Sequence, residues 1–235
     1  MASLKSVTVR GVRIGGGNPV VVQGMTKTPT SDVEATLGQI RALHEAGAEI
    51  VRIAVPDKEA VKALRFIRER TDVPLVADVH FDANLAVEAI HVGIDKVRVN
   101  PGTIGGKGAL EKVVDAALCA RVPIRLGINS GSLERHLLEK YGEPSPEAMV
   151  ESCEEWVRFL EGLGFQDIVV SLKSSSVVDT VRAYRLAAEK VPYPLHVGVT
   201  EAGTGTAGIV KSAVGIGALL LEGIGDTIRV SPTGD

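Results

Sequence analysis

The most informative residues of this chain are Val97-Arg98-Val99, an arginine between two aliphatic side chains in an apolar run. The same pattern recurs at Val51-Arg52-Ile53, Ile124-Arg125-Leu126 and Ile228-Arg229-Val230. Successive side chains of a β-strand point to opposite faces, so each arginine lies opposite to its aliphatic neighbours. A buried guanidinium group is costly unless an anion meets it. The repetition therefore predicts several strands with one shared interior face that receives negative charge.

Outward from these patterns, short aliphatic runs alternate with amphipathic stretches, which is typical of βα units. We expect eight strands, at Val20–Met25, Glu49–Val55, Pro74–His80, Lys96–Asn100, Pro123–Asn129, Asp167–Lys173, Pro194–Thr200 and Thr227–Ser231. We expect seven helices, at Asp32–Ala46, Lys58–Arg70, Ala83–His91, Gly108–Ala120, Pro146–Leu163, Val177–Lys190 and Ala207–Leu221. A hairpin formed by Val7–Arg10 and Val12–Ile14 precedes them. Eight parallel strands joined by helices favour an α/β fold of the TIM (β/α)8 barrel type over an open doubly wound sheet.

The predicted series lacks an eighth helix, because the chain stops at Pro232-Thr233-Gly234-Asp235 directly after the last strand. We therefore expect residues 1–235 to form one TIM-barrel domain, truncated before its eighth helix and taken from a longer polypeptide. A chain of 235 residues with 45% hydrophobic content is long enough for one large core.

Composition excludes several classes of function. The net charge of −3 gives no global attraction to nucleic acid or to an acidic membrane. Cys119 and Cys153 lack C-x-x-C spacing, so neither a disulfide framework nor a self-contained metal site is expected. The N-terminus has no apolar signal core, and the apolar stretch 209–224 is interrupted by Lys211 and Glu222. We expect a cytoplasmic protein without a membrane segment.

Polar side chains gather near the ends of the predicted strands, where barrel enzymes place their sites. They are Gln23, Arg52, Asp78, His80, Arg98, Asn100, Arg125, Asn129, Ser171, Lys173, His196, Glu201, Arg229 and Ser231. Guanidinium forks hold phosphate oxygens bidentately, and a lysine acts as a mobile point charge. The arginines and Lys173 therefore predict a diphosphate or bisphosphate ligand at the mouth of the barrel.

The acidic residues allow a second interpretation. Asp78, Glu201 and Asp226 could pair with the arginines as internal ion pairs that hold the barrel together. We favour the ligand interpretation, because five cations face too few interior acids for full pairing. Asp78 and Glu201 themselves suit either of two roles, as supports that orient arginines or as acid and base groups.

Four further residues have a functional and a structural interpretation each. His80 follows Asp78 by two residues on the same strand face, which suits a ligand contact or a proton donor. For His196 we favour a structural role. Asn129 and Ser231 suit hydrogen bonds to ligand oxygen, and their alternative is to cap turns at the strand ends.

Two glycine-rich runs are not nucleotide motifs in this context. Residues 203–208, Gly-Thr-Gly-Thr-Ala-Gly, match G-x-G-x-x-G, but no complete second βαβ half follows them. We expect a tight loop whose backbone N–H groups suit phosphate. Residues 102–108 do not form a Walker motif, because Pro101 occupies the first glycine position, and we expect a flexible rim loop.

Several separated motifs together resemble a known family. They are Val22-Gln23-Gly24-Met25-Thr26-Lys27-Thr28, Asp32-Val33-Glu34-Ala35-Thr36, Val97-Arg98-Val99-Asn100-Pro101-Gly102, Thr200-Glu201-Ala202-Gly203 and Gly223-Ile224-Gly225-Asp226-Thr227-Ile228-Arg229-Val230-Ser231. This set resembles the N-terminal barrel of the 4-hydroxy-3-methylbut-2-enyl diphosphate synthases, oxidoreductases of the methylerythritol phosphate pathway of isoprene biosynthesis. The resemblance extends over nearly the whole chain.

The resemblance implies an activity. The family reductively opens and dehydrates 2-C-methyl-D-erythritol 2,4-cyclodiphosphate, with electrons from ferredoxin or flavodoxin. It implies that the substrate is bound by Arg52, His80, Arg98, Arg125, Asn129, Lys173, Arg229 and Ser231. It implies catalytic roles for Glu201, Asp78 and His80.

The resemblance also implies parts that this chain does not carry. In the family, a 4Fe-4S cluster is held by three cysteines and a glutamate in a C-terminal iron-sulfur domain, which closes over the barrel of the other subunit in a homodimer. Those cysteines are absent from residues 1–235. We therefore expect this barrel to bind substrate, to bind no metal and no cluster by itself, and to be inactive alone.

Two other classes of protein remain open from the sequence. A dihydropteroate-synthase-like transferase also has an anion site at a barrel mouth, but an aromatic content of 3% offers little for a pterin ring to stack on. A non-catalytic anion-binding barrel would use the same arginines without any chemistry.

Overall fold

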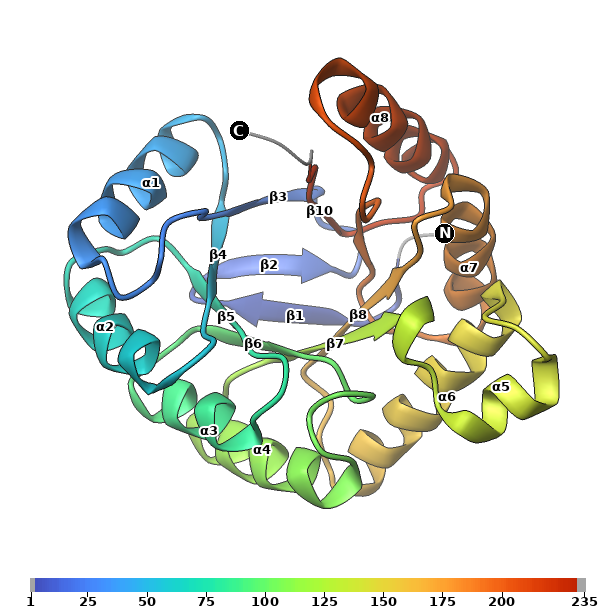
Figure 1. Ribbon diagram of the computed structural model, residues 1–235, viewed down its shortest axis with the longest axis horizontal. Coiled ribbons are helices and arrows are strands. Elements are labelled where there is room, and N and C mark those ends of the chain that lie inside the picture. Colours follow the sequence, from blue (N-terminus) through green and yellow to red (C-terminus); the bar gives the residue numbers. More distant parts are fainter. Residues whose placement is uncertain (1–2, 232–235) are drawn as a thin grey trace.

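A computed structural model describes residues 3–231, and the predicted barrel is confirmed (Figure 1). Eight parallel strands follow the order β8-β7-β6-β5-β4-β3-β10-β9. Their bounds are β3 Val21–Met25, β4 Ile50–Ala54, β5 Leu75–Asp78, β6 Lys96–Val99, β7 Ile124–Asn129, β8 Ile168–Lys173, β9 His196–Val197 and β10 Thr227–Ile228. A single parallel bridge between Val170 and Leu195 joins the two ends of the sheet, so the barrel is nearly closed.

Helices surround the sheet on its outer side (Figure 1). They are α1 Val33–Glu45, α2 Lys58–Glu69, α3 Ala83–His91, α4 Lys107–Ala120, α5 Arg135–Tyr141, α6 Pro146–Gly162, α7 Val177–Lys190 and α8 Gly205–Leu221, with a 3₁₀ turn at Ser130–Ser132. Side-chain oxygens cap several helix starts, as where Asp32 accepts from the Ala35 N–H. Within residues 3–231, none of these helices is long and apolar enough to cross a membrane.

The structure differs from the sequence prediction at two places. The short helix α5 was not predicted; it follows the buried Leu133 and anchors itself through the buried Leu137. Strands β9 and β10 are only two residues long, because Thr227 and Ile228 alone bridge β3 and β9. The expected stop before an eighth helix, at Pro232–Asp235, lies outside the described residues.

The amino-terminal end of the barrel is closed by the predicted hairpin, formed by β1 Ser6–Val9 and β2 Val12–Gly15. Figure 1 shows this hairpin lying across the centre of the barrel. Val9 and Ile14 pack there against Val21, Ile50 and Val76, which point inward from three strands. The hairpin therefore closes the barrel interior at this end with an apolar layer, and the interior opens at the carboxyl end.

Candidate functional site

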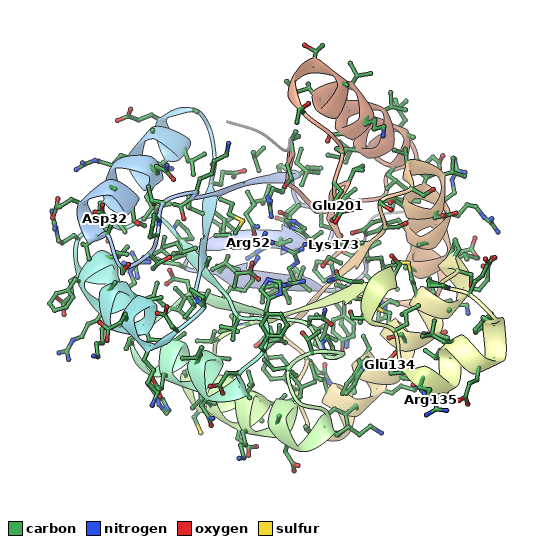
Figure 2. The ribbon with its side chains drawn as sticks, viewed as in Figure 1. Asp32, Arg52, Glu134, Arg135, Lys173 and Glu201 are labelled. Atoms are coloured by element: carbon green, nitrogen blue, oxygen red, sulfur yellow. The ribbon has the colours of Figure 1, made fainter. Side chains whose placement is uncertain are left out.

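Neighbouring strands bring the interior cations together in register. Asp78 pairs with Arg98 across β5 and β6, and Arg98 pairs with Arg125 across β6 and β7. Farther along the strands, Asn129 pairs with Lys173 across β7 and β8. Figure 2 shows Lys173 near the barrel centre, beside Arg52 and Glu201. The repeated arginine pattern thus forms one cluster, as the alternation of side chains predicts.

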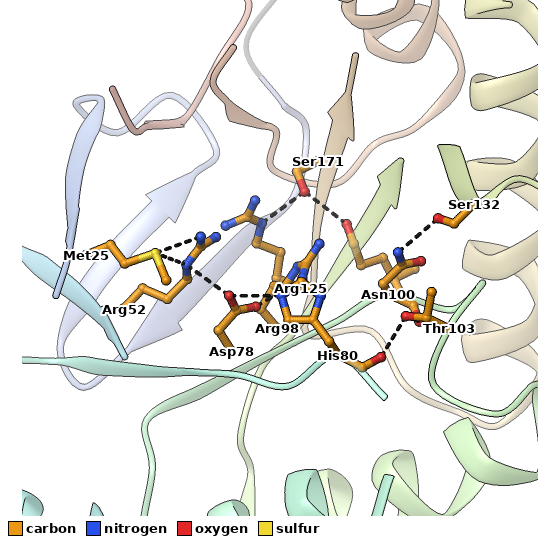
Figure 3. A network of polar contacts seen from close by, with 11 residues as sticks. Met25, Arg52, Asp78, His80, Arg98, Asn100, Thr103, Arg125, Ser132 and Ser171 are labelled. Carbon is orange, nitrogen blue, oxygen red and sulfur yellow. Dashed lines mark hydrogen bonds and ion pairs between the residues drawn. The ribbon is translucent and has the colours of Figure 1, made fainter. Parts of the chain in front are cut away.

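One half of this cluster is organised around Asp78 (Figure 3). Arg98 Nη1 lies 3.1 Å from Asp78 Oδ1 and 2.9 Å from His80 Nε2. Arg52 Nε lies 3.5 Å from Asp78 Oδ2, and Arg52 Nη2 lies 2.8 Å from Met25 Sδ. We call Asp78, Arg52, Arg98 and His80 the acidic half of the mouth. The name refers to the Asp78 carboxylate, which forms ion pairs with both arginines.

The charge of Asp78 is strongly favoured by these neighbours. Burial alone raises the pKa of this carboxyl group, but contact with His80 and the charges of Arg52 and Arg98 outweigh burial and lower the pKa below its ordinary range. Asp78 is therefore ionised at neutral pH and acts as the counter-charge of two arginines. An ionised and fully paired carboxylate is a poor general acid, which favours the orienting role for Asp78 over proton transfer.

The other half has no such counter-charge. Arg125 is fully buried, and its Nε donates to Ser171 Oγ at 3.0 Å. Its two terminal nitrogens have no hydrogen-bond partner in the described part of the chain. Asp78 and Asp226 are the buried carboxylates among residues 3–231, and Asp226 accepts instead from the Leu195 N–H at 2.8 Å. We call Arg125, Lys173 and Arg229 the open half of the mouth.

Burial and mutual repulsion destabilise the charges in this half. Burial, followed by the charges of Arg125, Arg98 and other arginines, lowers the pKa of Lys173 to about 5. Burial also lowers the pKa of Arg229, an effect that Asp78 partly offsets. An incoming anion would relieve this repulsion, so the open half is the more favourable place for negative charge.

Two connected pockets open at the mouth. The arginine pocket, of about 250 Å³, is lined by Arg52, Arg125, Ser171, Lys173, Tyr184, His196, Gly198, Val199, Thr200, Glu201, Arg229 and Ser231. The hydroxyl pocket, of about 520 Å³, is lined by His80, Phe81, Arg98, Asn100, Thr103, Asn129, Ser130, Gly131, Ser132, Lys173, Ser174, Ser175, Thr200 and Glu201. Lys173, Thr200 and Glu201 line both pockets, so one ligand can reach from one pocket into the other.

Glu201 stands where the two pockets meet. Its side chain is exposed, and its backbone φ of 52° lies in the left-handed region, which is unfavourable for a residue other than glycine. Such strain is concentrated at functional sites. Glu201 is the carboxylate that lines both pockets, and it lies over the open half, where a group that donates or accepts a proton can reach a bound ligand.

The hydroxyl pocket contains the predicted Asn100 and two residues that sequence reasoning missed, Thr103 and Ser132. Asn100 Nδ2 donates to Ser132 Oγ at 3.0 Å, and Thr103 Oγ1 donates to the His80 carbonyl at 2.6 Å. A Cβ atom on Gly102 would lie 2.1 Å from the Ser132 carbonyl oxygen, so only glycine fits there. These contacts join the loops after β5, β6 and β7. The small hydroxyl residues carry no periodic pattern, and only a strand-end position could have pointed to them.

Most of the predicted site residues line these pockets. Three predictions need comment: Asp78, His196 and the glycine run at 203–208. Asp78 lines neither pocket and lies beneath them. His196 lines the arginine pocket, with its Nδ1 3.3 Å from Thr227 Oγ1, and burial followed by nearby cations lowers its pKa well below the ordinary value. The glycine run at 203–208 leads into α8 and contributes no residue to the lining of either pocket.

The residues present do not fit a metal ion or an iron-sulfur cluster. Within residues 3–231, no group of three or more His, Cys, Asp or Glu side chains is placed to hold a metal. Cys119 is exposed on α4, whereas Cys153 is buried on α6. Burial raises the pKa of the Cys153 thiol to about 12, so this cysteine is not a thiolate at neutral pH.

Solved structures with the same architecture share little sequence with this chain. Dihydropteroate synthase from Yersinia pestis superposes with a TM-score of 0.67 at 16% identity, covering 95% of this chain and 90% of that one. Type I 3-dehydroquinate dehydratase from Clostridium difficile gives a TM-score of 0.68 at 14% identity, covering 98% and 90%. At these identities the likeness shows the barrel fold and nothing about the chemistry.

Sequence comparison is much more specific. The chain is 54% identical over 231 residues to 4-hydroxy-3-methylbut-2-en-1-yl diphosphate synthase (flavodoxin) of Caldanaerobacter subterraneus, covering 98% of this chain and 65% of the relative. It is 57% identical to the protein of the same name from Nitratidesulfovibrio vulgaris, covering 98% and 60%. The chain thus spans less than two thirds of these relatives. Residues 4–235 match the family described as the GcpE TIM-barrel domain, and the chain therefore belongs to that family.

Proposed function

We propose that this chain is the substrate-binding barrel of a 4-hydroxy-3-methylbut-2-enyl diphosphate synthase and binds 2-C-methyl-D-erythritol 2,4-cyclodiphosphate. The observation that carries the proposal is the open half of the mouth. Arg125, Lys173 and Arg229 line the arginine pocket, and within residues 3–231 no salt bridge joins any of them to a carboxylate. A cyclic diphosphate supplies two adjacent negative groups, and guanidinium forks bind such oxygens bidentately.

The two pockets bind different parts of the ligand. The phosphoryl groups occupy the arginine pocket, where Arg52, Arg125, Lys173, Arg229 and Ser231 donate to their oxygens. The carbon skeleton reaches into the hydroxyl pocket. There His80, Arg98 and Asn129 bind it, and the buried Asn129 Oδ1, which has no partner among residues 3–231, accepts from a ligand hydroxyl group.

Glu201 is the group for proton chemistry. It lines both pockets, so its carboxyl group reaches the ligand where the phosphoryl and carbon parts meet. Loss of a hydroxyl group as water requires a proton on the leaving oxygen, and a positioned carboxyl group supplies one. Asp78 has a supporting part, since it keeps Arg52 and Arg98 charged and oriented.

The complete activity needs parts outside this chain. We propose, from the family resemblance, that the electrons reach a 4Fe-4S cluster held by a further domain of the longer protein, of which this chain spans about 65% in one relative. The name of the relatives includes flavodoxin, which we propose as the electron donor. The assembly we propose is a cytoplasmic homodimer of the full-length protein, and this barrel alone binds substrate without turnover.

Titration calorimetry with the cyclodiphosphate tests the proposal. We expect saturable binding, and Arg125→Ala weakens it by about 1.5–3 kcal/mol if Arg125 makes a charge-assisted hydrogen bond. Arg135→Ala is the matched control, because Arg135 is exposed on α5 and pairs there with Glu139. No detectable heat at millimolar ligand would contradict the proposal. Equal affinity for inorganic pyrophosphate would instead favour a generic anion-binding barrel.

A further inference from the structure

The barrel interior holds a second lysine that has no counter-charge. Lys96 is the first residue of β6, and it is fully buried. Its position two residues before Arg98 on the same strand places both side chains on the inner face. Its Nζ has no hydrogen-bond partner in the part of the chain that the structure describes. A buried ammonium group must satisfy three donors and offset the loss of its hydration, and no hydrogen bond within residues 3–231 does this for Lys96.

The charges of Arg125 and Arg52 act on Lys96, whereas its neighbour in register, Val76, is apolar. The charged and titratable groups that the strands place in this interior are Arg52 from β4, Asp78 from β5, Arg98 from β6, Arg125 from β7, Lys173 from β8, His196 from β9 and Arg229 at the end of β10. At the mouth, His80, Tyr184 and the exposed carboxylate of Glu201 line the same pockets as Lys173. Strand β3 contributes the neutral Gln23, whose two polar side-chain atoms are buried and lack partners among residues 3–231. Asp78 is the buried acid of this set, and Arg52 and Arg98 already share it, whereas Glu201 is exposed to solvent.

The lysines are the groups that can relieve this excess of charge. Guanidinium groups stay protonated in proteins, whereas a buried lysine readily gives up its proton. Burial, followed by the charges of Arg125 and Arg52, lowers the pKa of Lys96 to about 7. The pKa of Lys173 is lower still, at about 5. A neutral Lys96 amine also offers a lone pair to an interior that otherwise contains mostly unpartnered donors.

We propose that anion binding at the mouth is coupled to proton uptake: Lys173 and Lys96 are neutral amines in the empty barrel and become ammonium groups when a dianion occupies the arginine pocket. The proposal rests on the proposed function, because it concerns the same site. The protons come from solvent, and the only bonds that form are N–H bonds. The bound phosphoryl charge then replaces the missing carboxylates.

The direction of the pH effect follows from linkage. When a bound ligand raises the pKa of a protein group, that group takes up protons on binding. The affinity for the ligand therefore increases as the pH falls from the pKa of the group in the complex toward its pKa in the empty site. Binding of the cyclodiphosphate is therefore weakest in alkaline buffer and strengthens as pH falls through neutrality. Below the Lys173 pKa of about 5, this gain ends.

Calorimetry in several buffers measures the coupling. The phosphoryl groups of the cyclodiphosphate are diester-like strong acids, so the ligand itself does not titrate near neutral pH. At pH 7.5, the slope of binding enthalpy against buffer ionisation enthalpy should show uptake of about one to two protons. Lys96→Met should lower this number and still bind, whereas the exposed Lys112→Met should not change it. Binding with a slope of zero would overturn the coupling and leave the proposed function intact.

A measurement on the ligand-free barrel separates the two proposals. If the cyclodiphosphate does not bind, the proposed function fails, and the lysines are then tested by NMR of protein labelled at the lysine ε-carbon. We expect at least one lysine signal with a neutral-amine shift at pH 8, and the Lys96 signal is identified by its loss in Lys96→Met. Ammonium shifts for every lysine of the wild-type barrel at pH 8 would overturn the inference. This outcome does not depend on whether the Lys96→Met variant folds.

Discussion

The acidic half and the open half of the mouth are built from the same residue type with opposite electrostatics. Arg98 and Arg125 are paired in register on β6 and β7, and both are fully buried. Arg98 is hydrogen-bonded to Asp78 and His80, whereas among the residues described the Arg125 side chain donates a hydrogen bond only to the hydroxyl group of Ser171. The comparison teaches that strand position sets where an arginine lies, and that its neighbour decides its role. An arginine paired with Asp78 also supports the barrel, whereas Arg125 has no acid partner and is available to a ligand alone.

The largest expected effect comes from removing the acid of the acidic half. Asp78→Asn keeps the shape of the side chain and leaves Arg52 and Arg98 without their shared counter-charge. We expect a loss of about 3–5 kcal/mol in the free energy of unfolding, measured by urea denaturation. Glu34→Gln is the control, since it breaks an exposed pair with Arg70 and should change little. A stable Asp78→Asn barrel would show that the acidic half is not structural.

The open half should respond in the opposite way. Arg125→Met removes a buried charge that has no acid partner, so the free energy of unfolding should stay equal or rise. The affinity for the cyclodiphosphate should fall by about 1.5–3 kcal/mol, measured by calorimetry. If Arg125→Met instead destabilised the barrel as strongly as Asp78→Asn, the distinction between the two halves would be wrong.

A smaller effect is expected at the boundary between the halves. A Cβ atom on Gly127 would lie 2.7 Å from Arg98 Nε, so Gly127→Ala forces the guanidinium group away from Asp78. We expect a loss of about 1–3 kcal/mol in stability by urea denaturation, together with weaker binding. Gly38→Ala on α1 is the control, because nothing lies within 4 Å of its Cβ and alanine favours a helix. Unchanged stability in Gly127→Ala would mean that Arg98 has room to move.

The smallest expected effect concerns the closure of the barrel beside the open half. The Tyr184 hydroxyl group accepts from the Leu172 N–H at 3.0 Å and donates to the His196 carbonyl, so it links β8 to β9. Tyr184→Phe removes both hydrogen bonds and should cost about 0.5–1.5 kcal/mol in urea denaturation. Affinity for the cyclodiphosphate should fall slightly, since Tyr184 lines the arginine pocket. A loss as large as that of Arg125→Met would assign Tyr184 a direct part in binding.

Much of the fold could be predicted because the chain repeats one local pattern. Aliphatic residues flanking an inward arginine identify β4, β6 and β7 directly, and the alternation with amphipathic stretches predicts their helices. The short strands β9 and β10 were predicted too long, because their length depends on pairing across the seam of the barrel, which a local pattern does not contain. Helix α5 was not predicted, because the turn-rich sequence around it resembles a loop.

The candidate site could be predicted less completely. Strand-end position identified Arg125, Lys173 and Glu201 and their convergence at the mouth. Strand-end position did not show which arginines form ion pairs with Asp78, because those pairs depend on side-chain geometry across three strands. Lys96 was missed for a different reason. A lysine at the first position of an apolar strand resembles an exposed strand end, and only its complete burial shows that it belongs to the interior.

Titration of the wild-type barrel and of Arg125→Met with 2-C-methyl-D-erythritol 2,4-cyclodiphosphate tests the central claim most directly, namely that the unpaired arginine half binds the diphosphate. We predict saturable one-to-one binding by the wild type and at least about tenfold weaker binding by Arg125→Met, as a loss above about 1.4 kcal/mol requires. Absence of binding by the wild type at millimolar ligand, or equal affinity of the two proteins, would contradict it.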